Sequence, residues 1–311
     1  MIPLEEIRRA RERLGDAVLR TPLVRFDERI WLKLENLQPI GSFKLRGALS
    51  AIRAAGPAEL AGGVVTASAG HMGQGVAWAA RELGLRATIV APETAPRAKL
   101  DAIERLGGAV VSVPYEVWWQ TMVDRRYEGL DGLFVHPVED ETVMAGNGTI
   151  GLELVEDLPD LDAVVVPWGG GGLTTGIASA VKALRPGVRV ITAEPATAAP
   201  LAASLAAGEP TQIDFQPSFV DGAGGRALLP TMWGHARELV DHASAVPLDE
   251  VVLAMGLLAS RARIVAEGAG ALALAAALRG DAGEGKVVCI VSGGNIDAAV
   301  LARVLAGDVP S

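Results

Sequence analysis

The sequence has little of several features, and each scarcity excludes a class of protein. It holds 1 cysteine in 311 residues, which excludes an internal disulfide and a cysteine-cage zinc site. No run reaches about 18 uninterrupted apolar residues, so a membrane-spanning helix is not expected. The 28 basic residues are outnumbered by 37 acidic ones, which gives a net charge of −9. This balance argues against nucleic acid as the main partner, because phosphate backbones recruit basic surfaces.

The N-terminal segment also lacks a targeting signal. It reads MIPLEEIRRARERLG, which is charged and has no apolar stretch of the kind that a secretory signal needs. We therefore expect a cytoplasmic protein. Apolar and small residues are abundant instead: 50% of the chain is hydrophobic and 37 residues are glycine. That content is enough for a substantial core, and the length fits two modest domains or one large one.

Short β-branched runs alternate with alanine-rich amphipathic segments along the chain. This alternation predicts βαβ units and parallel sheets. The predicted strands are 30–34, 63–67, 87–91, 109–113, 163–167, 188–193 and 286–291, and the predicted helices are 43–54, 73–83, 97–106, 173–184 and 296–305. A longer helix is predicted from an N-cap at Asp249 to Glu267, and another is predicted to start at 268–271.

Two glycine-containing segments carry reactive side chains near the start of a helix. In GSFKLRG, residues 41–47, Lys44 lies among apolar neighbours. It is either a solvated helix residue or a desolvated amine, which is a good nucleophile. In SAGHMGQG, residues 68–75, the backbone amides that open the helix suit an anion such as a carboxylate. An ordinary turn with a structural His71 is the alternative interpretation.

Two further glycine segments directly follow apolar strands. Four glycines in GGGGLTTG, residues 169–176, leave no Cβ to block the amides at a helix start, which favours a phosphate cradle. The segment is not a Walker A loop, because no GK[ST] follows, and it fits a dinucleotide fingerprint poorly. In SGGN, residues 292–295, Ser292 ends a buried strand, where α/β sheets place ligand contacts. A helix N-cap or a turn serine is the alternative there.

Six segments taken in order resemble one family. They are KLENLQPIGSFKLRGA, TASAGHMGQGVA, AGNGTIGLE, GGGGL, EGAGA and SGGNID, and they resemble the fold-type II pyridoxal-phosphate (PLP) enzymes of the threonine/serine dehydratase and serine racemase branch. The resemblance covers nearly the whole chain. It implies an α/β fold of two open parallel-sheet domains, like the tryptophan synthase β chain, with PLP in the cleft between them. The large domain is expected at 1–51 plus 142–311, and a small mobile domain at 52–141.

The resemblance also implies roles for the matching positions. Lys44 is the lysine that bonds PLP as a Schiff base, and Ser292 hydrogen-bonds the pyridine nitrogen. The expected cofactor contacts are Phe43, Lys44, His71, Gly169, Gly170, Gly171, Gly172, Leu173, Glu267 and Ser292. The expected substrate contacts are Ser68, Ala69, Gly70, Met72 and Gly222, and the expected catalytic residues are Lys44 and His71.

Several positions depart from the family's pattern. His71 stands where an Asn usually contacts the 3-hydroxyl of PLP, and Met72 stands where the family has His. His71 either takes over that contact, acts as an acid or base, or is a tolerated exchange. Ala69 replaces the serine that racemases use to transfer a proton, which disfavours racemisation. Pro200 replaces the second carboxylate of a cation site that starts at Glu194, so no metal is expected.

Two other segments are less clear from sequence. FVDGAGG, residues 219–225, differs from the family's usual apolar continuation after Asp-Gly, and together with Met72 it indicates an altered substrate pocket. Trp118 and Trp119 are either lid or surface residues or, as we favour, core residues.

The chemistry of the resemblance favours elimination. A serine beside the pyridine nitrogen makes PLP a weaker electron sink, which suits rapid loss of a β-substituent. We predict an ammonia-lyase (dehydratase) that converts a 3-hydroxy amino acid, threonine or serine first, to a 2-oxo acid and ammonia. Hydroxyaspartate, phenylserine or a hydroxyectoine-derived amino acid are alternative substrates. β-Replacement, racemisation or epimerisation, and a non-catalytic PLP- or amino-acid-binding protein are alternative functions.

The remaining expectations concern assembly. A homodimer is expected from the resemblance alone. The catalytic unit takes up the 311 residues, so we expect neither a C-terminal regulatory domain nor feedback inhibition through one.

Overall fold

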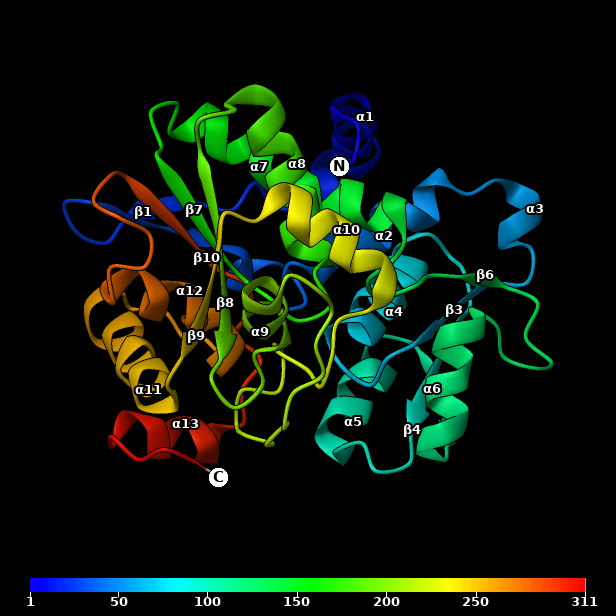
Figure 1. Cartoon of the computed structure of the whole chain (residues 1–311). Helices are drawn as coiled ribbons and strands as arrows, with labels where there is room; N and C mark the ends of the chain where they lie inside the picture. Colours follow the sequence, from blue (N-terminus) through cyan, green and yellow to red (C-terminus); the bar gives the residue numbers. More distant parts are fainter. Residues whose placement is uncertain (311) are drawn as a thin grey trace.

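The strands form two separate open sheets, which confirms the predicted α/β class (Figure 1). The computed structural model describes residues 1–310. The six-stranded sheet has the order β1-β2-β10-β7-β8-β9 and is parallel except for the antiparallel pair β1–β2. Its strands are β1 (Leu23–Arg25), β2 (Ile30–Leu34), β7 (Ala163–Pro167), β8 (Arg189–Pro195), β9 (His242–Val246) and β10 (Val287–Val291).

The four-stranded sheet is parallel throughout and has the order β5-β4-β3-β6. Its strands are β3 (Val64–Ala67), β4 (Ala87–Pro92), β5 (Ala109–Val113) and β6 (Leu133–Phe134). They come from one continuous stretch of the chain, whereas the six-stranded sheet takes strands from both sides of that stretch. The division into domains at 52–141 remains a prediction.

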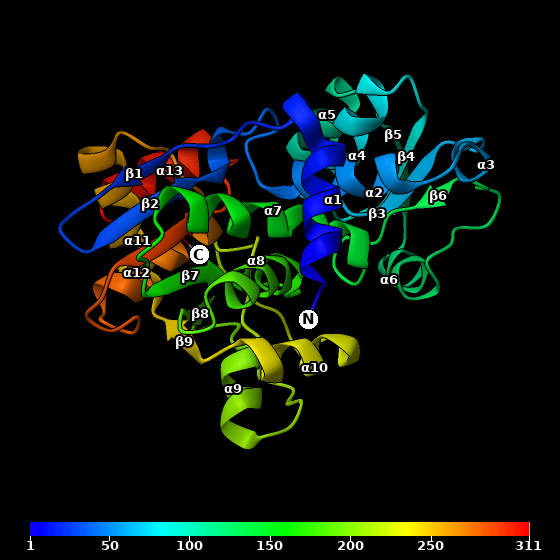
Figure 2. The same ribbon diagram turned by 90° about the horizontal axis from the view of Figure 1, so that it is seen from above.

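Helices cover both faces of each sheet. They are α1 (Leu4–Leu14), α2 (Lys44–Ala54), α3 (Pro57–Leu60), α4 (His71–Glu82), α5 (Arg97–Arg105), α6 (Tyr115–Asp124), α7 (Glu141–Asp157), α8 (Gly172–Leu184), α9 (Pro200–Ala207), α10 (Pro230–Leu239), α11 (Leu248–Leu257), α12 (Gly268–Leu278) and α13 (Ala298–Leu305). Helix α2 packs against both α4 and α7 and so joins the two halves of the molecule (Figure 2).

The central strand β7 shows why its sequence is apolar at every position. All five residues of AVVVP are buried. Val164 and Val166 face one way, into a cluster with Ile177 of α8, whereas Val165 faces the other way, into a cluster with Leu272 of α12. Because successive side chains in a strand alternate between the two faces, a strand covered on both sides cannot carry the usual polar face.

A buried group of four charges fixes the start of α2. Arg46 donates to Glu35 at 2.8 Å and to Glu153 of α7 at 2.6 Å. Lys33 of β2 pairs with the same Glu153 at 2.5 Å and donates to the carbonyl of Thr21 at 2.7 Å. The two cations balance the two anions, so none of these buried charges is unpaired. The group lies two residues beyond Lys44 and ties β2, α2 and α7 together.

The predicted strands and the shorter predicted helices all form, with bounds close to those expected. The long helix predicted to reach Glu267 is wrong: α11 ends at Leu257, and a π turn follows at Leu258–Ala262. The helix stops because Arg263 adopts the left-handed conformation (φ 63°). Asp249 is not the N-cap either, since Pro247 holds that position and Asp249 lies in the first turn.

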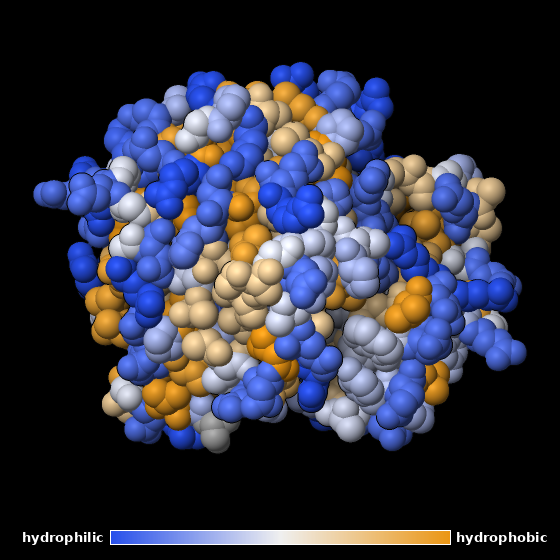
Figure 3. All heavy atoms as spheres, in the orientation of Figure 1, coloured by the Kyte–Doolittle hydropathy of each residue, from blue (hydrophilic) through white to orange (hydrophobic). Residues whose placement is uncertain are grey.

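Two other expectations concern the neighbouring tryptophans and a membrane-spanning helix. Trp118 packs against a small buried cluster of the four-stranded sheet, as favoured from sequence, but Trp119 is 42% exposed. Within residues 1–310, none of the helices combines the length and the apolar character needed to cross a membrane. On the face shown in Figure 3, hydrophilic residues surround apolar ones that gather in patches.

Candidate active site

Lys44 is the first residue of α2 and is partly buried. Burial lowers the pKa of Lys44 to about 8, because desolvation disfavours the ammonium form. The amine donates to the carbonyl oxygen of Pro137 at 3.0 Å and lies 5.1 Å from the centre of the Phe43 ring. A lysine with a lowered pKa provides a substantial fraction of free amine near neutral pH, as a nucleophile or base requires.

The segment before Lys44 is held by the loop that follows β10. Phe43 N donates to the carbonyl of Ser292 at 3.0 Å, and Ser42 pairs with Gly293 as an isolated antiparallel bridge. Asn295 Nδ2 donates to the carbonyl of Ile40 at 2.8 Å. Ser292 itself is buried. Two of the four segments singled out from sequence are therefore in direct contact, although about 250 residues separate them, as a parallel sheet with long crossovers permits.

His71 and Glu267 form a pair next to these loops. His71 Nε2 lies 3.3 Å from Glu267 Oε2. Glu267 N donates to the Gly293 carbonyl at 3.2 Å, and a Cβ at Gly293 would collide with the Glu267 carboxylate and lie 3.3 Å from His71 Cε1. The resemblance placed Glu267 beside the site but did not pair it with His71. The two residues come from α4 and from the start of α12, so the pair joins the two halves of the molecule.

The loop Gly169–Gly172 opens α8 and packs tightly. Gly171 has a φ of 96°, and a Cβ there would lie 2.5 Å from the Trp168 ring. A Cβ at Gly170 would collide with Val138. Just past the loop, the hydroxyls of Thr174 and Thr175 are buried and have no hydrogen-bond partner in the described chain. The amides at this helix start suit an anion.

Gly222 links the glycine loop Gly169–Gly172 to the His71–Glu267 pair. A Cβ at Gly222 would lie 3.5 Å from Glu267 Oε1, and the Gly222 carbonyl would lie 3.4 Å from a Cβ at Gly169. The structure therefore brings all four sequence segments, together with Glu267 and Gly222, into one region.

The loop Ser68–Gly70 is more open than the glycine loop Gly169–Gly172. Ser68, Ala69 and Gly70 are each partly exposed at the start of α4, and Gly70 N donates to Ser68 Oγ at 3.2 Å. Met72 behaves differently: it is 1% exposed and belongs to a hydrophobic cluster with Leu45. Its side chain fills the core behind the loop.

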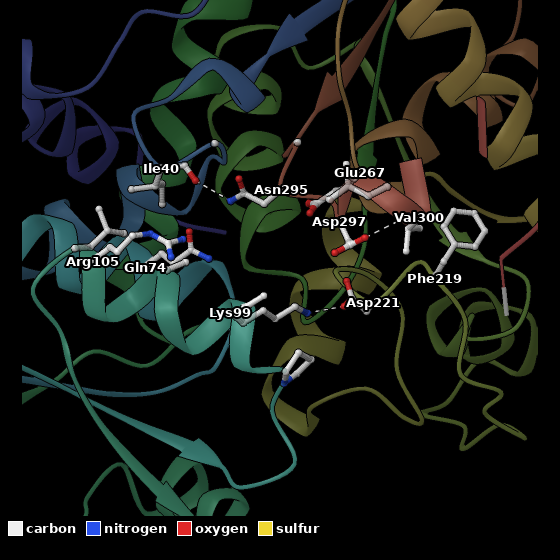
Figure 4. Close-up of a pocket in the computed structure, with 18 of the residues that line it drawn as sticks. Ile40, Gln74, Lys99, Arg105, Phe219, Asp221, Glu267, Asn295, Asp297 and Val300 are labelled. Carbon is white, nitrogen blue, oxygen red and sulfur yellow. Dashed lines mark hydrogen bonds and ion pairs between the residues drawn. The ribbon is translucent and has the colours of Figure 1, made fainter. Parts of the chain in front are cut away.

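A cavity of about 880 Å³ lies between the two halves. Helix α5 forms one wall, and the segment leading into α13 forms the other (Figure 4). Glu267 and Gln74 lie along it, and the Lys99 amine points toward Asp221, with which it pairs at 2.5 Å (Figure 4). The cavity gives Glu267 a route to solvent, and the Lys99–Asp221 pair spans it.

Glu194 is the residue at which the cation site considered in the sequence would start. Its carboxylate is buried and accepts from Leu201 N at 3.1 Å and Ala202 N at 2.9 Å. Burial raises its pKa to about 7. Pro200 opens α9 beside it. Within residues 1–310, no group of three or more His, Cys, Asp or Glu residues has an arrangement that could hold a metal ion.

The residues present fit PLP. A buried amine of lowered pKa is available to bond an aldehyde, and a glycine loop at a helix start is available for a phosphate. The hydroxyl of Ser42 is buried and, like those of Thr174 and Thr175, has no partner among the described residues. Buried polar groups are normally satisfied, so unpartnered hydroxyls on both sides of the site indicate a missing polar ligand.

Sequence reasoning missed the residues that frame this site from behind. The turn at Pro137 and Val138, which contacts Lys44 and the glycine loop, was not singled out. Trp168, which is buried beneath Gly171, directly follows the predicted strand 163–167 and was not singled out either. A tryptophan directly before four glycines was the available signal, because a large side chain can lie under a loop that has none.

Comparison with known proteins identifies the family. The family described as "Pyridoxal-phosphate dependent enzyme" matches residues 14–293. L-threonine ammonia-lyase of Thermotoga maritima is 40% identical, over 98% of this chain and 78% of the relative. Maize serine racemase superposes with a TM-score of 0.88 at 32% identity and covers 97% of this chain and 96% of its own. The processed form of threonine deaminase isoform 2 from Solanum lycopersicum has a TM-score of 0.86 at 31% identity, over 98% of this chain and 86% of its own. The chain belongs to the fold-type II pyridoxal-phosphate enzymes, in the threonine/serine dehydratase and serine racemase family.

Proposed function

We propose that the protein is an ammonia-lyase (dehydratase) that converts L-threonine or L-serine to a 2-oxo acid and ammonia. The observation that carries the proposal is the buried Lys44 amine, which lies where all four glycine segments meet. The Thermotoga maritima relative is named for this reaction with threonine.

The residues have distinct roles in this proposal. Lys44 would bond the aldehyde of PLP, and the bound cofactor would supply an electron sink for the carbanion left by loss of the α-proton. The amides of Gly169–Leu173 would hold its phosphate, Ser292 would hydrogen-bond its pyridine nitrogen, and Phe43 and Glu267 would contact its ring. The amides of Ser68–Gly70 hold the substrate carboxylate near Gly222, and Met72 supports that loop from the core.

In this proposal Lys44 moves the substrate proton and His71 supplies a hydrogen bond. Lys44, once released, accepts the α-proton through its neutral amine, which its lowered pKa makes available. His71, oriented by Glu267, hydrogen-bonds the 3-hydroxyl of the cofactor in place of the usual Asn. Lys44 would pass the α-proton to the departing β-hydroxyl, which would leave as water. The released enamine would then take up one water and give the 2-oxo acid and ammonia.

The decisive experiment is a screen of hydroxy amino acids. L-threonine, L-serine, hydroxyaspartate, phenylserine and a hydroxyectoine-derived amino acid are incubated with the holoenzyme, and 2-oxo acid and ammonia are measured together. Equal amounts of both products from threonine or serine are expected. The remaining substrate is checked for inversion, because inversion without oxo acid would show a racemase and overturn the proposal.

Racemisation is the second candidate, because the His71–Glu267 pair offers an acid/base that Ala69 cannot supply. The maize structure shows that a racemase shares this fold. The same screen separates the two reactions, and β-replacement is tested by adding a thiol to it. If cofactor binds and no substrate is changed, the protein is a binding protein.

We also propose that no metal is needed. Both oxygens of Glu194 already accept backbone amides, and Pro200 supplies no ligand. Activity measured before and after a chelator is expected to be equal, and loss that Mg²⁺ restores would contradict this. The homodimer and the cytoplasmic location also remain proposals that rest on the resemblance; sedimentation of the holoenzyme tests the first, and cell fractionation the second.

A further inference from the structure

The turn after β6 is built around one buried histidine. His136 is 2% exposed. Its Nδ1 accepts from the backbone amides of Val138 at 3.1 Å and Glu139 at 2.8 Å. An imidazole nitrogen that accepts two hydrogen bonds carries no proton, so the ring is neutral, with its hydrogen on Nε2. His136 Nε2 lies 3.6 Å from Glu139 Oε2, so Glu139 closes the turn on the other side of the ring.

The same turn contacts both ends of the cofactor site. The carbonyl of Pro137 accepts from Lys44 Nζ at 3.0 Å. Val138 packs against the glycine loop: a Cβ at Gly170 would collide with its side chain, and a Cβ at Gly172 would lie 2.9 Å from its carbonyl oxygen. Two consecutive residues therefore face the lysine and the phosphate loop, and the histidine before them holds their backbone.

We propose that His136 is a positioning residue for the reaction: by holding residues 137–139, it sets where the released Lys44 amine rests and supports the phosphate loop. This inference rests on the proposed function. A carbonyl that accepts one N–H of a neutral amine fixes the nitrogen and leaves its lone pair free, as proton abstraction from the substrate requires.

Electrostatics support a permanently neutral ring. Burial lowers the pKa of His136 to about 4, the cations Arg125 and Lys44 act in the same direction, and Glu139 and Asp140 act in the opposite direction. Protonation would remove the acceptor that the two amides need. At neutral pH the histidine therefore works as a fixed acceptor and not as an acid.

Two substitutions separate this role from simple packing. His136→Asn keeps an acceptor close to the Nδ1 position, because the Asn side-chain oxygen can accept the same amides. His136→Leu keeps bulk and removes the acceptor. His242→Leu, at an exposed position on β9, is the matched control. Folding of each full-length variant is checked by circular dichroism.

The first measurements use no substrate. PLP affinity is titrated, and the rate at which Lys44 of the apo chain reacts with PLP is followed against pH. We expect His136→Leu to weaken PLP about tenfold or more, since two amides lose their acceptor. We also expect its reaction midpoint to move down by about 0.5 pH units, because the carbonyl that stabilises the ammonium form is displaced. His136→Asn is expected to recover at least half of each effect.

The second measurement is turnover with the hydroxy amino acid that the proposed screen identifies as the substrate. His136→Leu is expected to lower kcat about tenfold while KM changes less than about threefold, because the affected amine acts in the chemical step. The proposal is overturned if His136→Leu matches the wild type, or if Asn and Leu are equally impaired. Should His136→Leu not fold, His136→Asn decides: PLP affinity within about threefold of wild type supports the role, and a tenfold loss contradicts it. The PLP measurements stand even if no hydroxy amino acid is converted.

Discussion

The loops at 169–172 and 68–70 start from the same plan and differ in packing. Each follows a buried strand and opens a helix, so each presents backbone amides to an anion. Around Gly171 there is no free space, and its φ of 96° excludes most side chains. Around Gly70 the nearest atom to an added Cβ is 3.9 Å away, and its φ of −103° is open to any residue.

Under the proposed function, this difference in packing matches a cofactor at one loop and a substrate at the other. A loop that is packed against Trp168 and Val138 holds its amides in a single arrangement, which suits a cofactor that stays bound. The partly exposed Ser68–Gly70 loop has room to adjust around a substrate that enters and leaves. The His71–Glu267 pair and the Lys99–Asp221 pair connect the half of the molecule that holds the loop 68–70 to the half that holds the loop 169–172.

The largest effect is expected from loss of the Lys44 amine, which would bond the cofactor and act on the substrate. Lys44→Ala should lower turnover by at least about 10³-fold, because both the bond to PLP and the base are lost. The phosphate loop is untouched, so the variant should still bind PLP without a covalent bond. Borohydride fixes PLP that is bonded to a lysine, so near-ultraviolet absorbance that stays with the protein after reduction and denaturing gel filtration separates covalent from non-covalent PLP. Lys286→Ala, at a lysine whose side chain is 41% exposed, is the control. A Lys44→Ala enzyme with a tenth of normal activity would exclude the role.

The stability of the protein should also depend on the buried charges at the start of α2. Arg46→Met leaves the buried Glu35 without its cationic partner and leaves Glu153 with Lys33 alone, and breaking a buried pair typically costs about 3–5 kcal/mol of unfolding free energy. Urea unfolding measures the loss. Arg11→Met is the control, because Arg11 pairs with Glu156 on the surface and such pairs contribute about 0–1 kcal/mol. Equal losses in the two variants would show that the buried group does not anchor α2.

The loops themselves can be compared by one methyl group each. Gly171→Ala should weaken PLP by at least about 30-fold, because a left-handed alanine is strained by about 1–2 kcal/mol and the methyl also meets Trp168. Gly70→Ala should change PLP affinity and KM by less than about threefold. Titration of PLP and steady-state kinetics measure both variants. A large effect at Gly70 would mean that the open loop closes more tightly around the substrate than its free form shows.

The sequence predicts the parts of this site that depend on local patterns. Runs such as AVVVP locate a strand that is covered on both faces, and the glycines after it locate the loop that opens α8, which we propose as the phosphate site. The predicted end of helix α11 was wrong. The helix ends near a left-handed residue, Arg263, and an arginine gives no helix-breaking signal in the sequence. His136 was missed because HPV looks like an ordinary loop. Its importance comes from contacts with Lys44 and Gly170, which are distant in the chain.

The smallest effect is expected at His71, where the sequence departs from its family. His71→Asn should lower kcat about tenfold and shift the visible spectrum of the holoenzyme, if the imidazole has taken over the contact to the cofactor 3-hydroxyl. Glu267→Gln should act in the same direction, since it removes the charge that faces Nε2. The double variant tests whether they act together: a pair that works as a unit should lose no more than His71→Asn alone. Unchanged spectrum and turnover in His71→Asn would make the histidine a tolerated exchange. The half of the molecule that holds the loop 68–70 would then contribute only backbone amides to the chemistry, and its difference from the half that holds the loop 169–172 would be greatest.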